Sequence, residues 1–258
     1  MSPTLILLAV LVALVLATVG WLALTVRGIV SPPAIRPATY RPSGRPVVVC
    51  AGDSITHGTV SADWVSDLRA RLAGRADVVN AGINGELAWN LDQRVEGILA
   101  IEPAVVVVLI GSNDTMGVLD DAWAQHYITD HGLPQEPSLD FYTDNLQRLL
   151  SRLDTRATVA VCTLPPLGEQ DDSRIAGFVA ERNAVVERVA SKLGIEILRL
   201  HERIRERFPA RPEAPRFEED RARARKLMEM SAAQHSLLRR SWDAIAARRG
   251  LTVTHDHL

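Results

Sequence analysis

Residues 104–114 read AVVVVLIGSND, and this stretch decides the fold class. The residues from Ala104 to Ile110 are all apolar and mostly β-branched, which favours a strand. A continuous apolar run is typical of a strand that is covered on both faces, and such strands occur mainly in parallel sheets. The stretch therefore predicts a buried strand within a parallel sheet.

Further strands and helices are predicted on both sides of this stretch. Strand-like runs occupy residues 47–51, 77–81, 157–163 and 196–200. Helical patterns occupy residues 61–72, 87–100, 139–153 and 175–193. This alternation predicts an α/β fold, a three-layer α/β/α sandwich around a five-stranded, mostly parallel sheet.

Residues 202–249 break the alternation, because they are highly charged with leucine and methionine interspersed. The pattern predicts one or two amphipathic helices. Runs of charge usually form solvated faces, so we expect a surface helix here. The alternative is a lid over a substrate cleft.

The overall composition excludes several classes of protein. The chain has 258 residues, with 29 Lys and Arg against 31 Asp and Glu, for a formal net charge of -2. Nucleic-acid binders usually carry a basic excess, so no nucleic-acid partner is expected. Hydrophobic residues make up 47% of the chain, which is ordinary for a folded protein. The two cysteines, Cys50 and Cys162, are too few for a disulfide framework or a cysteine-rich zinc site.

The N-terminal residues form a separate apolar stretch. Thr4 to Val26 includes no charged residue, and a helix of this length would cross a hydrocarbon core of about 30 Å. We therefore predict a single-pass transmembrane anchor over residues 1–27. A cleaved signal peptide is the alternative, although the apolar run is longer than usual and no basic residue precedes it.

A proline-rich linker is predicted over residues 28–45, between this anchor and a folded domain at residues 46–258. Prolines in the linker favour extended geometry over a helix. Arginines follow the apolar stretch, so the positive-inside rule alone would place the domain in the cytoplasm. That rule is weaker when a large domain follows, so the side of the membrane stays open, as does the oligomeric state.

Polar and glycine residues follow three of the predicted strands. Residues 52–54 read GDS, residues 80–85 read NAGING, and residues 111–114 read GSND. The carboxyl ends of parallel strands meet at one edge of the sheet, where ligands bind in such folds. Each residue alone has a simpler role, such as the helix cap for Ser54 or a turn for Asn113. Together, however, they indicate an active site.

This set of residues is suited to acyl transfer. Ser54 at a tight turn would be an exposed nucleophile. The backbone N–H groups of Ser54 and Gly85, with the Asn113 amide, would surround the oxyanion of a tetrahedral intermediate. Glycine at position 85 lets the backbone approach the substrate closely.

These blocks resemble those of the SGNH (GDSL-type) hydrolases. The resemblance covers about residues 46–258 and implies a flavodoxin-like sandwich with Ser54 as nucleophile and Ser54, Gly85 and Asn113 as the oxyanion hole. It also implies cleavage of carboxylic acyl esters, with a small-molecule, lipid or glycan ester as substrate. No metal or organic cofactor is implied.

The last block of that family, D-x-x-H, fits this chain only in part. If Asp256 is its aspartate, the histidine that serves as general base would fall one place beyond the last residue. We therefore expect a truncated C-terminus, with His257 or His255 as alternative bases. A third hypothesis is an SGNH-fold binding protein without the base. A metal site on these residues is less favoured because their spacing is poor, and His57 is expected to be a surface or first-turn residue.

Overall fold

Five parallel strands form the centre of the molecule in the computed structural model, which describes residues 2, 6, 10–21, 36–170, 173–207 and 214–252. The strands are β1 (Val47–Gly52), β2 (Asp77–Gly82), β3 (Val105–Leu109), β4 (Thr158–Cys162) and β5 (Glu196–Leu198). Their order in the sheet is β2-β1-β3-β4-β5. The predicted five-stranded parallel sheet is therefore confirmed.

The register of the first three strands brings their carboxyl ends to one level. Gly52 of β1 pairs with Gly82 of β2 and with Leu109 of β3. The segments that follow these strands therefore start side by side, at one edge of the sheet.

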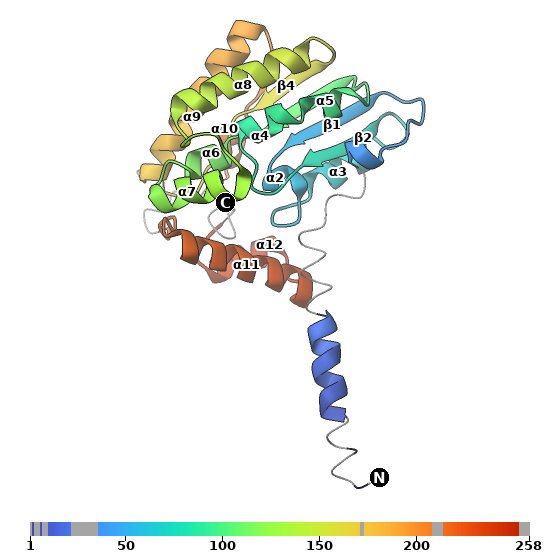
Figure 1. The fold of residues 1–258 in the computed structure, drawn as a ribbon, viewed down its shortest axis with the longest axis vertical. Helices are drawn as coiled ribbons and strands as arrows, with labels where there is room; N and C mark the ends of the chain where they lie inside the picture. The colour runs from blue at the N-terminus through green and yellow to red at the C-terminus, as the bar shows by residue number, and fades with distance from the viewer. Residues whose placement is uncertain are drawn as a thin grey trace.

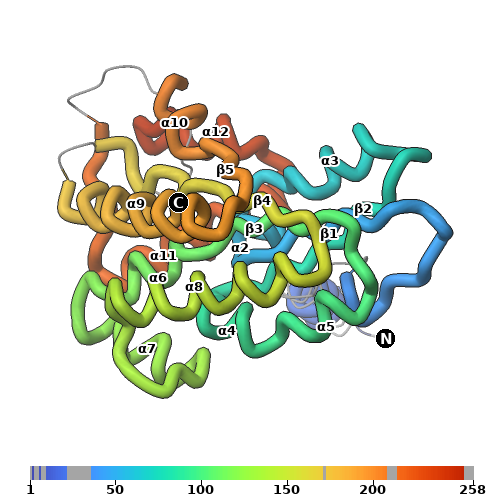
Figure 2. Tube along the Cα trace, turned by 90° about the horizontal axis from the view of Figure 1, so that it is seen from above, coloured from blue at the N-terminus to red at the C-terminus, as the bar shows by residue number. Residues whose placement is uncertain are grey.

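Helices cover one face of the sheet, as Figure 2 shows. They are α4 (Ala88–Gln93), α5 (Val95–Leu99), α8 (Leu139–Asp154) and α9 (Arg174–Leu193). Alternate strand residues, such as Val49 and Val106, point into this layer and are fully buried with Leu146 and Val186. Because side chains alternate along a strand, the residues between them face the opposite side.

The opposite face is covered by α3 (Trp64–Arg71), α10 (Leu200–Arg205) and α12 (Trp242–Arg248), which lie on the other side of the strands in Figure 2. Cys50, Val78 and Val65 form a small buried cluster beneath α3. The two helical layers and the sheet confirm the predicted three-layer sandwich.

The helices differ from the prediction in two ways. The predicted helix over residues 87–100 is two helices, α4 and α5, which meet at Arg94. The Arg94 guanidinium donates to Glu86 and to the Ala81 carbonyl at the sheet edge, a contact that no local pattern encodes. In addition, α2 (Ser54–His57), α6 (Ser112–Met116) and α7 (Asp121–His131) were not predicted.

The charged C-terminal region contains the long helix α11 (Arg221–Leu238). Figure 1 shows α11 lying across the end of the molecule that carries α2 and α7. The Trp123 indole of α7 donates to the Glu219 carbonyl (2.8 Å), which fixes the start of α11 over this end. Only Ser231 and Ala232 of this helix are buried, as expected of a helix near the surface, but the helix also covers the carboxyl edge of the sheet.

The predicted transmembrane helix is not found among the described residues. Residues 10–21 are helical and stand apart from the sandwich in Figure 1. None of the helices in the described ranges combines the length and apolar character needed to cross a membrane.

The second half of the predicted linker packs onto the folded domain. Tyr40 is buried with the residues that α5 contributes to the main core. Its hydroxyl donates to Asp77 (2.9 Å), which also forms an ion pair with Arg45 (2.6 Å). Hydrogen bonds from Ser43 and Arg45 lower the pKa of Asp77 to about 2. The last residues of the predicted linker are therefore bound to Asp77, at the start of β2.

Candidate active site

Ser54 lies where β1 ends and α2 begins. The Asp53 carboxylate caps α2 by accepting from the Ile55 N–H (2.9 Å). Ser54 is half-buried, and no side chain in the described ranges bonds to its hydroxyl. His57 ends the same short helix but is buried, with Nδ1 2.8 Å from the Thr59 hydroxyl. It is thus a first-turn residue, and its predicted place on the surface was wrong.

Gly85 lies in the turn that follows β2, and two features there require glycine. Its φ of 78° is in the left-handed region, which side chains rarely adopt. A Cβ at this position would also lie 2.2 Å from the imidazole ring of His131. The His131 ring therefore lies directly against the backbone of Gly85.

Asn113 is held by two hydrogen bonds that define the direction of its amide. Its Nδ2 donates to the Glu86 carbonyl (2.8 Å), and its Oδ1 accepts from the Tyr127 hydroxyl (2.9 Å). A backbone carbonyl only accepts, so the group facing Glu86 must be the NH₂. Burial raises the pKa of Tyr127 well above its usual value, so this phenol keeps its proton and donates.

The structure brings Ser54, Gly85 and Asn113 together on the wall of one cavity of about 300 Å³. The N–H groups of Ser54 and Gly85 donate to no protein acceptor within the described part of the chain. Asn113 also has a second Nδ2 hydrogen beyond the one that Glu86 accepts. Three donors beside a serine hydroxyl can stabilise the oxyanion of a carbonyl under attack.

Buried carboxyl groups lie beneath these donors. Burial raises the pKa of Asp53 to about 7, with a further contribution from Asp114 and Glu86. Burial also raises the pKa of Asp114 to about 7, against the opposing effects of the Ala88 N–H and Arg182. Partly protonated carboxyl groups place less negative charge under the site, which favours an anion above them.

The helices α7 and α11 complete the cavity. They contribute His126, His131, Tyr127, Arg221 and Arg225, which the sequence analysis did not identify as site residues. No local motif marks them. The residues of α7 lie in a helix that was not predicted, and the two arginines of α11 stand in a run of many charged residues. Residues of α11 line the cavity, so this helix is more than a solvated surface helix. That it acts as a lid stays a prediction.

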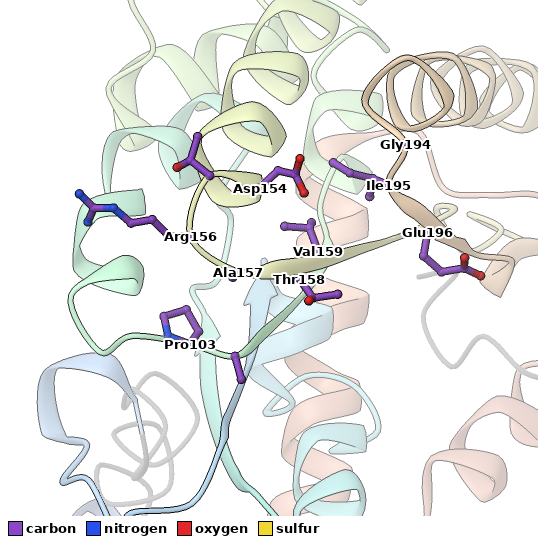
Figure 3. A pocket seen from close by; sticks show the side chains of 11 residues that line it. Pro103, Asp154, Arg156, Ala157, Thr158, Val159, Gly194, Ile195 and Glu196 are labelled. Atoms are coloured by element: carbon purple, nitrogen blue, oxygen red, sulfur yellow. The ribbon is translucent and has the colours of Figure 1, made fainter.

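Another hollow, of about 560 Å³, lies at the opposite edge of the sheet (Figure 3). Pro103 and Thr158 mark the beginnings of β3 and β4 there, with Asp154, Arg156 and Glu196 around them. The residues shown include no histidine, cysteine or serine. The cavity beside Ser54 is therefore the better candidate for chemistry.

The remaining predicted site residues are not placed. Asp256, His257 and His255 lie outside the described residues. Among the residues that are described, no group of three or more histidine, cysteine or acidic side chains is arranged to hold a metal ion.

A family model described as the GDSL-like Lipase/Acylhydrolase family matches residues 50–219. The chain belongs to this family. The match includes Ser54, Gly85 and Asn113 and ends before the C-terminal histidines. As an acylhydrolase, the protein is an enzyme that hydrolyses ester bonds.

Solved structures with a similar fold include other esterases. The acetyl xylan esterase AlAXEase is 20% identical, with a TM-score of 0.53 over 72% of this chain and 98% of its own. Axe2, an acetylxylan esterase from Geobacillus stearothermophilus, is 20% identical with a TM-score of 0.50, over 62% of this chain and 78% of its own. LAE5, an α/β hydrolase from the metagenome of Lake Arreo, is 19% identical with a TM-score of 0.51, over 74% and 94%. A comparison with curated proteins finds no similar sequence.

The hydrogen bond from Tyr127 to Asn113 gives a prediction for this acylhydrolase. Tyr127→Phe should lower kcat by about five-fold with little change in KM, because one neutral hydrogen bond that orients the amide is lost. Ester hydrolysis at saturating and limiting substrate measures the two constants.

Tyr142→Phe is the matched control. It removes an equally buried hydroxyl, which donates to the Ile110 carbonyl (3.2 Å) and does not touch Asn113. This variant should lose stability but keep its kcat. An equal loss of kcat in both variants would show that Tyr127 has only a structural role.

Proposed function

We propose that this acylhydrolase is a serine esterase that acts through an acyl-Ser54 intermediate. The single observation that carries the proposal is that the residues of three available N–H donors line one cavity with Ser54. The donors come from Ser54, Gly85 and Asn113. Because they lie on segments fixed by strand register and by the Tyr127 hydrogen bond, they need little reorganisation when an oxyanion forms.

The proposed reaction has two steps. Ser54 Oγ attacks the ester carbonyl carbon and gives its proton to a base, while the carbonyl electrons move to the oxygen that faces the three donors. The tetrahedral intermediate then expels the alcohol, which takes up the proton, and leaves the acyl-serine ester. Water attacks this ester in the same way and releases the carboxylic acid and free Ser54.

Membership of the family indicates an ester substrate but does not identify its acyl or alcohol part. We propose a small-molecule, lipid or glycan acyl ester. The acetyl xylan esterases with the same fold support a glycan ester, and an apolar cavity beside Ser54 supports a longer acyl chain. No metal or organic cofactor takes part in the proposed steps.

A fluorophosphonate probe tests the nucleophile. It should label the wild-type enzyme, and Ser54→Ala should abolish labelling, because only an activated serine is phosphonylated. Ser61→Ala is the matched control, since Ser61 also lies beside the cavity and bonds to the Ile55 carbonyl (3.1 Å). Equal labelling of wild type and Ser54→Ala would refute the assignment and would favour the binding-protein hypothesis.

For the general base we propose His257, the histidine nearest to the place where the last block of the resemblance requires one. His131 is a second candidate, because it lines the cavity with Ser54. Burial, with a smaller effect of His126, lowers the pKa of His131, so its ring is neutral and can accept a proton near pH 7.

Two histidine variants separate these candidates. His257→Ala should lower kcat by about a thousand-fold or more, as expected when a triad histidine is lost. His131→Ala should lower it by less than about ten-fold, the smaller effect expected of a substrate contact. The reverse order would assign the base to His131. The measurement is single-turnover acylation with a chromogenic ester.

We also propose that the apolar N-terminal stretch attaches the enzyme to a membrane. The described residues Leu14 and Leu16 are at least 60% exposed on their helix. The full chain should therefore stay in the membrane fraction after alkaline carbonate extraction, and Leu14→Arg with Leu16→Arg should release it. The same pair of charges at Met230 and Leu238, two exposed residues of α11, should not. Complete extraction of the wild-type chain would contradict the proposal.

A further inference from the structure

Two cavities meet at Ser54, and they differ in the charged side chains that line them. We call the one lined by α7 and α11 the polar chamber, because two histidines and two arginines lie among its otherwise largely apolar lining, and the other the apolar chamber. Ser54 and Asn113 line both. An ester carbonyl carbon bonded to Ser54 Oγ carries the acyl chain on one side and the alkoxy oxygen on another. The two ends of a substrate must therefore diverge from this point.

The apolar chamber has a volume of about 490 Å³, far more than an acetyl methyl group needs. Its floor is the face of the sheet that α8 and α9 do not cover, and its walls come from α3, α10 and α12. The residues that define it are Val107, Cys162, Leu198, Trp64, Ile204 and Trp242. Among its described lining residues the only charged one is Asp243, which is exposed.

The polar chamber carries positive charge. Arg221 and Arg225 reach into it from α11, and no acidic residue is among its described lining residues. Their acidic neighbours lie outside the lining: Asp130 is 4.0 Å from Arg221, and Glu229 pairs with Arg225 (2.9 Å). Both acids are more than half exposed, so water and salt screen these pairs and an anionic group of a substrate can compete for the arginines.

The two histidines of the polar chamber do not add to this charge at neutral pH. Burial lowers the pKa of His126 and of His131. His126 Nδ1 lies 2.7 Å from Asp130 and 2.9 Å from the Arg221 guanidinium, so it links Arg221 to α7. The positive charge in the chamber thus comes from the two arginines.

We infer that the preferred substrate is an ester of a chain much longer than acetate with an alcohol that bears a negative charge. The acyl chain occupies the apolar chamber, where each methylene is removed from water. The anionic part of the alcohol lies in the polar chamber beside Arg221 and Arg225. This inference rests on the proposed nucleophile, Ser54, because both chambers are defined relative to it.

Chain-length selectivity tests the apolar chamber in the full-length enzyme. With para-nitrophenyl acetate, butyrate, octanoate and dodecanoate, kcat/KM should rise by up to about four-fold per methylene until the chamber is filled. Leu198→Trp should lower the ratio of octanoate to acetate by about ten-fold or more, because the indole takes the place of several methylenes. The ratio is independent of any loss of folded enzyme.

Leu238→Trp is the matched control, because Leu238 is an exposed residue of α11 that lines neither chamber. Its octanoate-to-acetate ratio should equal that of the wild type. A wild-type preference for acetate, or an unchanged ratio in Leu198→Trp, would overturn the assignment of the acyl chain to this chamber.

Alcohol selectivity tests the polar chamber. The octanoyl esters of para-hydroxybenzoate and of its methyl ester differ in one negative charge on the alcohol. Wild type should prefer the charged ester, and Arg225→Gln should reduce that preference by about three-fold, as expected for a largely exposed charge. Arg223→Gln removes a charge from the same helix outside the chamber and should leave the preference unchanged.

The remaining outcomes are distinguishable. If the double variant with Arg221→Gln and Arg225→Gln still prefers the charged ester as strongly as wild type, the assignment of the anionic group to the polar chamber is overturned. If Ser54 reacts with fluorophosphonate but acetate is the best substrate, only the substrate inference fails. If Ser54 does not react and no ester is cleaved, the proposed function fails with it.

Discussion

The site depends on the register of three parallel strands. Gly52 lies opposite Gly82 on one side and Leu109 on the other, so Ser54, Gly85 and Asn113 all follow strand ends at one level. A shift of one residue would move a strand end by about 3.3 Å and reverse the faces of its side chains. Val49 and Val106, which are buried on the face covered by α8, oppose such a shift, and in this way the hydrophobic core determines the geometry of the donors.

The carboxyl groups beneath the donors are a consequence of the same arrangement. Asp53 and Asp114 follow β1 and β3 and are buried together, which raises the pKa of both to about 7. Arg94 and Arg182 lie close by and pair with Glu86 and with the Asp114 carbonyl. A buried carboxylate without a cationic partner would destabilise the fold, so each of these carboxyl groups must be protonated or lie beside a positive charge. That requirement also suits a site where negative charge develops on a substrate.

Local patterns predicted the strands, the longer helices and the serine, glycine and asparagine at the strand ends. Each of these features follows from a short stretch of sequence. For example, the four valines at residues 105–108 predict the strand that Asn113 follows. The parts that were not predicted depend on contacts between distant segments. Tyr127 orients Asn113 from a helix whose sequence has no strong apolar periodicity.

Two other departures have the same origin. The break at Arg94 lies where its guanidinium bonds to Glu86, and the buried Tyr40 donates its hydroxyl hydrogen to Asp77. The place of α11 over the site depends on the indole of Trp123 bonding to Glu219. None of these contacts follows from spacing along the chain.

The most direct test of the account is rapid mixing of the enzyme with a chromogenic ester, followed by acid quenching and intact-mass measurement. The account predicts a transient increase in mass by one acyl group, located on the peptide that contains Ser54 and absent from Ser54→Ala. Hydrolysis at the wild-type rate by Ser54→Ala, with no acyl adduct on either protein, would contradict it.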